Sequence, residues 1–372
     1  MKRIIFVIVA AVLLITLILG GCGQPAPPPT TAPPPATPPA TKPDTSLPPL
    51  VEDRSKWPTA ISIGTAAEGS SVYAQGAVVG TIITKYLGIP MAPEVMGGTA
   101  RYNGIAKGEL EFGMGSEDNV QWAVYGKIAK SWKGKPIPLR CMIPADNGTR
   151  AIVVNAKSDI KTIADLKGKK YAWPSYSETS NQTTDFSLAT AGLTLKDVVE
   201  KPLNSSKAGK AALIEGAVDA WMVVMGSPGG PAAETMDADN SIGIRALPLS
   251  EADAKSIEKS SNLCYHPIKL KAGYVSGNKE DFWAISFRRM VPCHRDAPED
   301  FIYAVTKAFW EHLDEAKKAL KDFDGYILPD QLVNAAAPYH PGAIRYYKEI
   351  GVWSDEMEKV NQTHLKNIGE TR

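Results

Sequence analysis

Apolar and polar positions follow one another along the chain in blocks that predict strands followed by helices. Ile61-Ser62-Ile63 alternates with period two, which is typical of a short strand, and it runs into a loop of small and polar residues, Gly64 to Ser71. After that loop, apolar pairs recur every four residues as far as Tyr86 and Leu87, which predicts an amphipathic helix. The unit is a strand, a small-residue loop and a helix.

The same order recurs downstream. Glu94-Val95-Met96 leads into Gly97-Gly98-Thr99 and a helix through Ile105, and a strand over residues 110–114 opens into the polar run 115–118. A second series contains strands over residues 151–154, 171–173 and 220–225, a hydroxyl-rich helix start over 174–180, a helix over 208–218 and a rigid turn over 226–231. This alternation favours α/β lobes with largely parallel sheets.

The two series divide the folded part into two lobes. We expect lobe 1 over residues 56–149, lobe 2 over residues 150–248, and a C-terminal region, residues 249–372, that returns to lobe 1 and the hinge. In open α/β sheets, ligands bind beyond the C-terminal ends of the strands. The sequence therefore predicts a ligand cleft between the lobes.

The N-terminus has the order of a secretory leader. Two basic residues, Lys2 and Arg3, precede the apolar run 4–19 and small residues before Cys22, so residues 1–21 are expected to be a signal peptide. The apolar run is shorter than the roughly 20 residues that span a bilayer. Leu19-Gly20-Gly21-Cys22 resembles a bacterial lipobox, which implies acylation of Cys22.

We therefore expect an extracytoplasmic protein, lipid-anchored at the periplasmic or outer face of a bacterial membrane. An uncleaved membrane anchor and a soluble exported protein remain alternatives, and both also export the folded part. Residues 22–55 form the expected tether, because the stretch from Pro25 to Leu50 is dominated by Pro, Thr and Ala, which favour extended polyproline II over a packed core.

The charge balance and the cysteine spacing argue against nucleic-acid binding and against a metal site. The chain has 41 basic and 40 acidic residues, so no basic field points to nucleic acid. Cys141, Cys264 and Cys293 show neither CxxC nor zinc-like spacing, and we expect no metal. A Cys264–Cys293 disulfide and buried free thiols both remain open.

The usual motifs of cofactor binding and catalysis are missing from the sequence. It contains no GxxxxGK[ST] phosphate loop and no GxGxxG at the first loop, and no GxSxG motif surrounds His266, His294 or His340. We therefore expect no cofactor and interpret these histidines as structural or surface residues. A binding protein is favoured over an enzyme.

The candidate ligand site consists of the small-residue loops that open helices. Unpaired N–H groups at a helix start, together with the helix dipole, stabilise a carboxylate or phosphate. Glycine and serine also cap helices for purely structural reasons, so one such loop is weak evidence for a ligand site. The hypothesis of a ligand site rests on the repetition of such loops in both lobes. The candidate ligand-binding residues are Thr65, Ser70, Ser71, Tyr73, Gly98, Thr99, Asn103, Ser116, Asp118, Ser175, Ser177, Thr179, Met225 and Gly226.

Several segments together match the pattern of a known family. They are Ile61–Thr65 with Tyr73, then Gly97–Asn103, Lys107–Gly113, Asp165–Lys170 and Ser177–Thr179, and the most specific is Tyr339-His340-Pro341-Gly342-Ala343-Ile344-Arg345-Tyr346-Tyr347-Lys348-Glu349-Ile350-Gly351. These segments resemble the TAXI-type substrate-binding proteins of TRAP transporters. The resemblance implies a monomeric, non-enzymatic clamshell of the type II-like periplasmic binding protein class. It also implies TRAP membrane subunits as partners and a small carboxylate or amino acid as ligand.

Two other functions remain open beside this one. A binder of the same architecture could serve an ABC importer or a sensor kinase, because lobe architecture does not identify the downstream partner. An exported enzyme that uses Cys293, His294 or His340 is the least favoured of the three.

The sequence departs from the family pattern at two loops. Glu68 stands in a first loop that is usually richer in glycine, and Glu178 stands where the family usually has glycine between a serine and a threonine. If these carboxylates face the cleft, they favour an amino acid or another ligand with a cationic group; they can equally lie in solvent. His340-Pro341 predicts a turn that starts a helix, because proline suits the first helical turn.

Overall fold

The computed structural model describes most of the chain after residue 46. The described residues are 47, 50–66, 68, 71–127, 132–175, 178–328, 332 and 335–371, with the side chains of 71, 146, 147, 174 and 178–180 left out. The expected leader, the lipidation site Cys22, the tether up to residue 46, Ser70 and Ser177 lie outside the described residues. No helix in the described ranges is long and apolar enough to cross a bilayer.

Strands and helices alternate, as the sequence pattern predicts. The strands are β1 (Ile61–Thr65), β2 (Met91–Val95), β3 (Phe112–Gly113), β4 (Gly115–Ser116), β5 (Leu139–Asn155), β6 (Lys170–Pro174), β7 (Val199–Leu203), β8 (Ala220–Ser227), β9 (Gly230–Pro231), β10 (Ile244–Ala246), β11 (His266–Leu270) and β12 (Phe282–His294). The α-helices are α1 (Ser71–Leu87), α2 (Gly98–Lys107), α3 (Glu117–Val124), α4 (Glu178–Ala189), α5 (Ser206–Ile214), α6 (Ala233–Ile242), α7 (Glu251–Ser260), α8 (Glu299–Glu311), α9 (Leu313–Ala319), α10 (Pro341–Glu349) and α11 (Asp355–Asn367). Short 3-10 turns cover Arg54–Lys56, Ala164–Leu166, Leu195–Asp197 and Lys321–Gly325.

The strands form one hydrogen-bonded sheet with two parallel groups. Its main path is β2-β1-β3-β12-β5-β8-β6-β7. β1 is parallel to β2 and β3, and β6 is parallel to β7 and β8. Between these groups, β12 and β5 are antiparallel to each other and to their outer neighbours β3 and β8.

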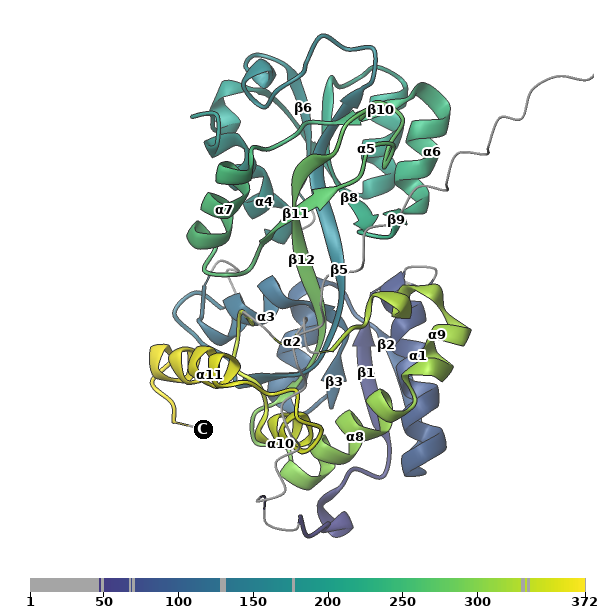
Figure 1. Ribbon diagram of the computed structural model, residues 1–372, viewed down its shortest axis with the longest axis vertical. Helices are drawn as coiled ribbons and strands as arrows, with labels where there is room; N and C mark the ends of the chain where they lie inside the picture. The colour runs from purple at the N-terminus through teal and green to yellow at the C-terminus, as the bar shows by residue number, and fades with distance from the viewer. Residues whose placement is uncertain are drawn as a thin grey trace, which may run out of the picture. The chain divides into compact units, whose positions relative to one another are not determined.

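The two long strands, β5 and β12, link the two groups (Figure 1). Residues 139–148 of β5 pair with 287–294 of β12, whereas residues 149–154 of β5 pair with β8. β12 pairs with β11 over its first five residues and with β4 and β3 further on. Both strands therefore pass from one group to the other near residues 148–150 and 286–289.

The hydrophobic cores divide in the same way. One large cluster contains β1, α1 and the C-terminal helices α8 and α10, with Ile63 and Phe309 fully buried in it. The second group is covered on both faces: Val153 and Trp221 belong to one cluster, and Ile152 belongs to another, because successive strand side chains point to opposite faces. The fold is thus the expected two-lobed α/β arrangement.

Residues after position 248, where lobe 2 is expected to end, pack in the clusters of both strand groups. Leu270, Val275 and Phe282 share a cluster with Val153 of β5. β11 is held there because it pairs antiparallel with the start of β12. Ile257, Cys264 and Tyr265, however, belong to the cluster that contains β1 and α1, so the position at which the chain returns to lobe 1 stays a prediction.

Candidate functional site

Strand β5 passes between the lobes at Gly148, where a phenyl ring of the neighbouring strand lies against the backbone. A Cβ added at Gly148 would overlap the ring of Phe287 on the neighbouring β12. Two residues further on, the guanidinium of Arg150 lies over the same ring, 4.0 Å from its centroid. Glycine is required at this point because the phenyl ring fills the space of a side chain.

Arg150 joins groups from both lobes. Its Nη1 lies 3.1 Å from Asp118 Oδ2 in α3 and 3.1 Å from Thr183 Oγ1 in α4, and it also contacts the Tyr265 hydroxyl at 3.3 Å. Tyr265 donates its own proton to Asp118 Oδ2 at 3.1 Å. We call Asp118, Arg150, Thr183 and Tyr265 the crossing cluster; all four are buried.

The surroundings of Tyr265 keep its hydroxyl protonated. Burial raises the pKa of Tyr265 well above its usual value, and the Asp118 carboxylate raises it further, against an opposing effect of Arg150. The hydroxyl therefore stays a hydrogen-bond donor at every physiological pH. A buried charge pair depends on further hydrogen bonds to its polar atoms, and Thr183 and Tyr265 contribute to them.

A second charged group lies beside the first on α3. Glu117 is fully buried, accepts a hydrogen bond from Ala336 N at 2.5 Å, and lies 3.8 Å from Arg288 Nε and 3.7 Å from His266 Nε2. Burial alone would raise the pKa of Glu117, but Arg288 and His266 outweigh it and the pKa is lowered. The carboxylate is thus ionised between elements of both lobes.

A third set of polar contacts involves Gln75, one turn after the start of α1. Gln75 donates through Nε2 to Asp322 Oδ2 at 3.1 Å and accepts from the Tyr326 hydroxyl at 3.2 Å. Arg289 of β12 approaches the same carboxylate, with Nη1 4.0 Å from Asp322 Oδ2. This chain of contacts fixes α1, whose first residue is Ser71, against the crossing strand.

Among the residues predicted from the sequence, Asp118 and Ser116 lie at the crossing. Ser116 is the N-cap residue of α3 and pairs with Arg289 in the sheet, and its Oγ accepts from Asn119 Nδ2 at 2.7 Å. Tyr73 lies in the first turn of α1, half-buried. Gly98 and Thr99 begin α2, after the N-cap residue Gly97.

Other predicted residues have structural partners. The buried Thr65 hydroxyl donates to Glu94 O at 3.2 Å, which ties β1 to β2. Asn103 accepts from Trp132 Nε1 at 2.8 Å, and the exposed Ser175 donates to Leu203 O at 2.6 Å, beside β7. Their role in ligand binding stays a prediction.

The two residues predicted at the end of β8 form part of its packing. Met225 is fully buried in the same cluster as Val153. Gly226 has φ 139° and a Cβ there would overlap Gly230 O, while its own carbonyl accepts from Thr149 Oγ1 at 3.1 Å. The turn expected from residue 226 onward starts later, because β8 continues to Ser227 and then pairs with β9.

For some of the predicted residues the structure describes only the backbone, and others lie outside the described residues. Ser71 and Thr179 lie in the first turns of α1 and α4, and their side chains are not described. Ser70 and Ser177 lie outside the described residues, as does the side chain of Glu178. Glu68 is exposed.

Sequence reasoning missed the arginines that organise the site. Arg150 stands directly before the apolar run 151–154, and Arg288 and Arg289 interrupt the apolar strand that begins at residue 282. Arg101 was noticed only as part of a motif, yet it is buried and donates to the carbonyls of Met114 and Met96. A charged residue inside an apolar strand pattern could have indicated them. Such residues are almost never buried without a partner, so each of these arginines implies an acidic or polar partner nearby.

The cysteines and His340 of the described part are buried. Cys141, Cys264 and Cys293 are free, buried thiols, and burial raises the pKa of each, so none is a ready thiolate. Within the described ranges no group of three His, Cys, Asp or Glu side chains could hold a metal ion. His340 N-caps α10 through Nδ1, as the His340-Pro341 sequence predicted.

Several solved binding proteins are similar to this chain. The aliphatic sulphonate binding protein SsuA from Escherichia coli has 17% identity and a TM-score of 0.44, covering 83% of this chain and 86% of that chain. SsuA from Xanthomonas axonopodis pv. citri bound to MOPS has 16% identity and a TM-score of 0.44, covering 85% and 95%. An ancestral arginine-binding protein bound to arginine has 16% identity and a TM-score of 0.43, covering 73% and 99%.

At these identities and TM-scores the likenesses carry no conclusion about the ligand of this chain. A family model gives the firmer result, because it matches residues 63–351, which include both lobes from β1 to the end of α10. The chain belongs to the NMT1-like family.

Proposed function

We propose that this protein binds a small solute between its two lobes and delivers it to a membrane transporter. One observation carries the proposal: Arg150 contacts Asp118 near the start of α3 in lobe 1 and Thr183 in α4 of lobe 2. The helices that follow polar loops in opposite lobes therefore meet at one buried side chain. A ligand that binds at these helix starts touches both lobes at once, as a clamshell requires.

The proposed ligand is an anionic or zwitterionic solute, either an organic acid or an amino acid. The starts of α1 at Ser71 and α4 at Glu178 offer backbone N–H groups and the positive ends of helices 17 and 12 residues long. Ser70, Ser71 and Tyr73 are proposed to hold the anionic group, with Ser177 and Thr179 completing the site from lobe 2. A zwitterion would also satisfy Glu68 if that carboxylate turns toward the ligand.

A thermal-shift screen of the leaderless chain tests this proposal. The panel contains organic acids, amino acids and alkanesulfonates, the last because two of the similar solved proteins are described as sulfonate binders. A ligand at a hundred times its Kd stabilises the folded state by about 2.7 kcal/mol. We expect a clear rise in melting temperature for one class; a flat response to the whole panel would contradict the proposed ligand class.

The proposed partner is a TRAP-type secondary transporter, and the proposed anchor is an acyl chain on Cys22. The support is the sequence resemblance of the segments around Gly97–Asn103 and Tyr339–Gly351. An ABC importer or a sensor kinase is the alternative partner, because lobe architecture does not identify the downstream partner. Copurification from membranes separates the two: integral TRAP subunits support the first, and a nucleotide-hydrolysing subunit supports the second.

A further inference from the structure

The imidazole of His266, at the start of β11, lies between two carboxylates that belong to different helices. Its Nδ1 is 3.0 Å from Glu258 Oε1 of α7, and its Nε2 is 3.7 Å from Glu117 Oε2 of α3. The side chain of His266 is 13% exposed and that of Glu117 is 0% exposed. The Glu258 side chain, at 26%, is the one of the three that reaches solvent most. The contact therefore joins α7 and α3 through one nearly buried ring.

Two facing atoms of this contact are buried and have no hydrogen bond. In the part of the chain that the structure describes, neither Glu117 Oε2 nor His266 Nε2 has a hydrogen-bond partner. A buried polar atom without a partner destabilises the fold. A carboxylate oxygen is an acceptor, so the two atoms are complementary when Nε2 carries a proton and repel each other when it does not.

The hydrogen-bonding capacity of the ring indicates its charge. Neutral imidazole has one donor nitrogen and one acceptor nitrogen, whereas the imidazolium cation has two donors. Both nitrogens of His266 face carboxylate oxygens. Either neutral tautomer would therefore direct a lone pair at a negative charge. The cation alone matches Glu258 and Glu117 at the same time.

Charged groups on β12 and α3 complete the surroundings of the ring. Arg288 Nε of β12 lies 3.8 Å from the same Glu117 oxygen, whereas the neighbouring Asp118 is paired with Arg150. Burial would raise the pKa of Glu117, but Arg288 and His266 outweigh it, and the pKa is lowered. The carboxylate that faces the ring is therefore ionised at neutral pH.

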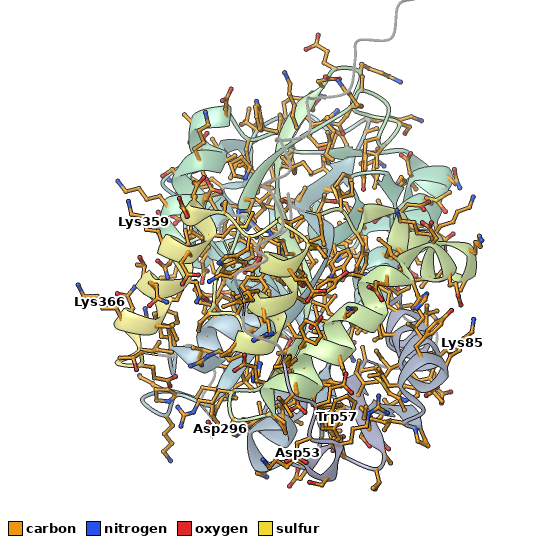
Figure 2. The ribbon with its side chains drawn as sticks, turned by 60° about the horizontal axis from the view of Figure 1, so that its bottom comes forward. Asp53, Trp57, Lys85, Asp296, Lys359 and Lys366 are labelled. Carbon is orange, nitrogen blue, oxygen red and sulfur yellow. The ribbon has the colours of Figure 1, made fainter. Side chains whose placement is uncertain are left out.

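His364 of α11 adds no positive charge beside this carboxylate. It lies on the inner face of its helix and is buried, whereas Lys359 and Lys366 point away from the protein (Figure 2). Its Nε2 is 2.7 Å from Ala335 O. Burial lowers the pKa of His364, although the bond to Ala335 and the Glu117 carboxylate oppose this. The ring of His364 is therefore neutral at pH 7.

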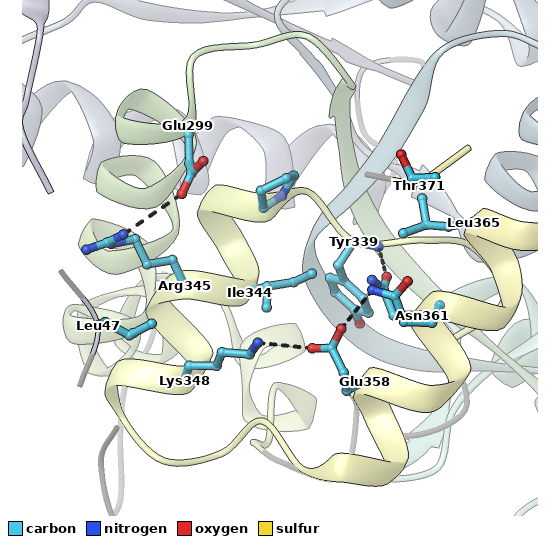
Figure 3. A pocket seen from close by; sticks show the side chains of 12 residues that line it. Leu47, Glu299, Tyr339, Ile344, Arg345, Lys348, Glu358, Asn361, Leu365 and Thr371 are labelled. Atoms are coloured by element: carbon cyan, nitrogen blue, oxygen red, sulfur yellow. Dashed lines mark hydrogen bonds and ion pairs between the residues drawn. The ribbon is translucent and has the colours of Figure 1, made fainter. Parts of the chain in front are cut away.

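The other oxygen of Glu117 is bonded to the segment before α10. Glu117 Oε1 accepts from Ala336 N at 2.5 Å. Further along this segment, Tyr339 N donates to Asn361 Oδ1 of α11 at 2.8 Å (Figure 3). The carboxylate is thus anchored at Oε1, and its Oε2 has a defined position opposite His266.

We propose that His266 carries a proton on both ring nitrogens in the folded protein and is a positioning residue for the start of α3. The imidazolium joins Glu258 to Glu117, which is the first residue of α3. Ser116 and Asp118, two candidate ligand residues, are the neighbours of Glu117 in the chain. The bridge therefore keeps this helix start in place at the crossing. Its consequence for a solute rests on the proposed function, whereas the charge of the ring does not.

Nitrogen-15 NMR of the histidine rings tests the charge directly. Residues 22–372 contain all five histidines, and His266→Gln identifies the His266 signals by their loss. An unperturbed histidine has a pKa of about 6.5, so a ring in water is mostly neutral at pH 7. At that pH we expect both nitrogens of His266 to show the shift of a protonated nitrogen. The shift of an unprotonated nitrogen at either position overturns the proposal.

Hydrogen exchange on the same chain tests the positioning role. Glu258→Gln removes one of the two negative charges that favour the imidazolium, and we expect amides of residues 117–121 to exchange about fivefold faster. Glu251→Gln is the matched control on the same helix, because Glu251 pairs with the exposed Lys255, and it should leave these amides unchanged. Equal exchange in the two variants overturns the positioning role. Both measurements are made without a solute, so their failure is distinguishable from a failure of the proposed solute binding.

Discussion

Asp118 and Arg150 form an ion pair in the interior, with Oδ2 and Nη1 3.1 Å apart and side chains that are 0% and 5% exposed. The pair connects α3 to the strand that passes between the lobes. Because both charges have left water, each depends on the other much more than two surface charges would. The crossing cluster therefore connects residues of both lobes through buried polar contacts.

Removing one partner of this pair should destabilise the protein strongly. Asp118→Ala leaves the Arg150 guanidinium buried without its carboxylate, and we expect a loss of about 3–5 kcal/mol in the free energy of unfolding. Urea titration followed by circular dichroism measures it. Glu251→Ala, which breaks the exposed pair with Lys255, should change stability by less than about 1 kcal/mol. Similar losses in both variants would show that the crossing cluster adds no special stability.

The close approach at Gly148 gives a second prediction. Gly148→Ala places a methyl group into the ring of Phe287, and we expect a loss of about 1–3 kcal/mol. In the double variant Gly148→Ala with Phe287→Leu, the smaller leucine side chain should leave room for the added methyl group. The double variant should therefore regain part of the lost stability. Thermal unfolding of the four proteins of this cycle measures the coupling. Additive losses would mean that the two residues do not touch.

His340 should make stability depend on pH. Its Nδ1 accepts from Gly342 N, and its Nε2 lies 3.1 Å from Ala297 O, so a neutral ring with the proton on Nε2 satisfies both groups. Burial lowers the pKa to about 4, although the bond to Ala297 opposes this. In the unfolded chain the pKa is near 6.5. Between about pH 6.5 and 4 the unfolded state binds a proton that the folded state does not, so stability falls as the pH falls, by about 1.4 kcal/mol per unit at most.

His340→Asn provides the comparison, because asparagine also caps helices but does not titrate. The free energy of unfolding, measured at intervals from pH 7 to 4.5, should decline less steeply in this variant than in the natural protein. Glu117 and other carboxylates still contribute near pH 4, so the difference is read above pH 5. Parallel pH profiles would contradict the assignment of this dependence to His340.

Local sequence patterns were sufficient for some of the regular elements. The alternation at Ile61-Ser62-Ile63 and the four-residue spacing that follows it correspond to β1 and α1, and the strand predicted from Ala220 is β8. β5 was harder to predict. It runs for 17 residues through Pro144 and Gly148, which read as breakers, because the tertiary crossing and not local propensity keeps that segment extended.

The candidate site was less predictable than the fold, for a related reason. Met225 is one of the candidate ligand residues; it is fully buried in the cluster of Val153, and its role in ligand binding stays a prediction. The partners of Arg150 come from residues 118, 183 and 265, which no local pattern connects. Such contacts depend on the tertiary packing of elements that are distant in sequence, and the pattern of a single sequence does not reveal that packing.

The most direct test of the central claim is hydrogen exchange with and without a ligand found in the thermal-shift screen. If the solute binds between the lobes, amides at the starts of α1, α3 and α4 should be protected together, in residues 71–75, 117–121 and 178–183, while exchange in α11 stays unchanged. Protection confined to one lobe, or to α10 and α11, would contradict the account.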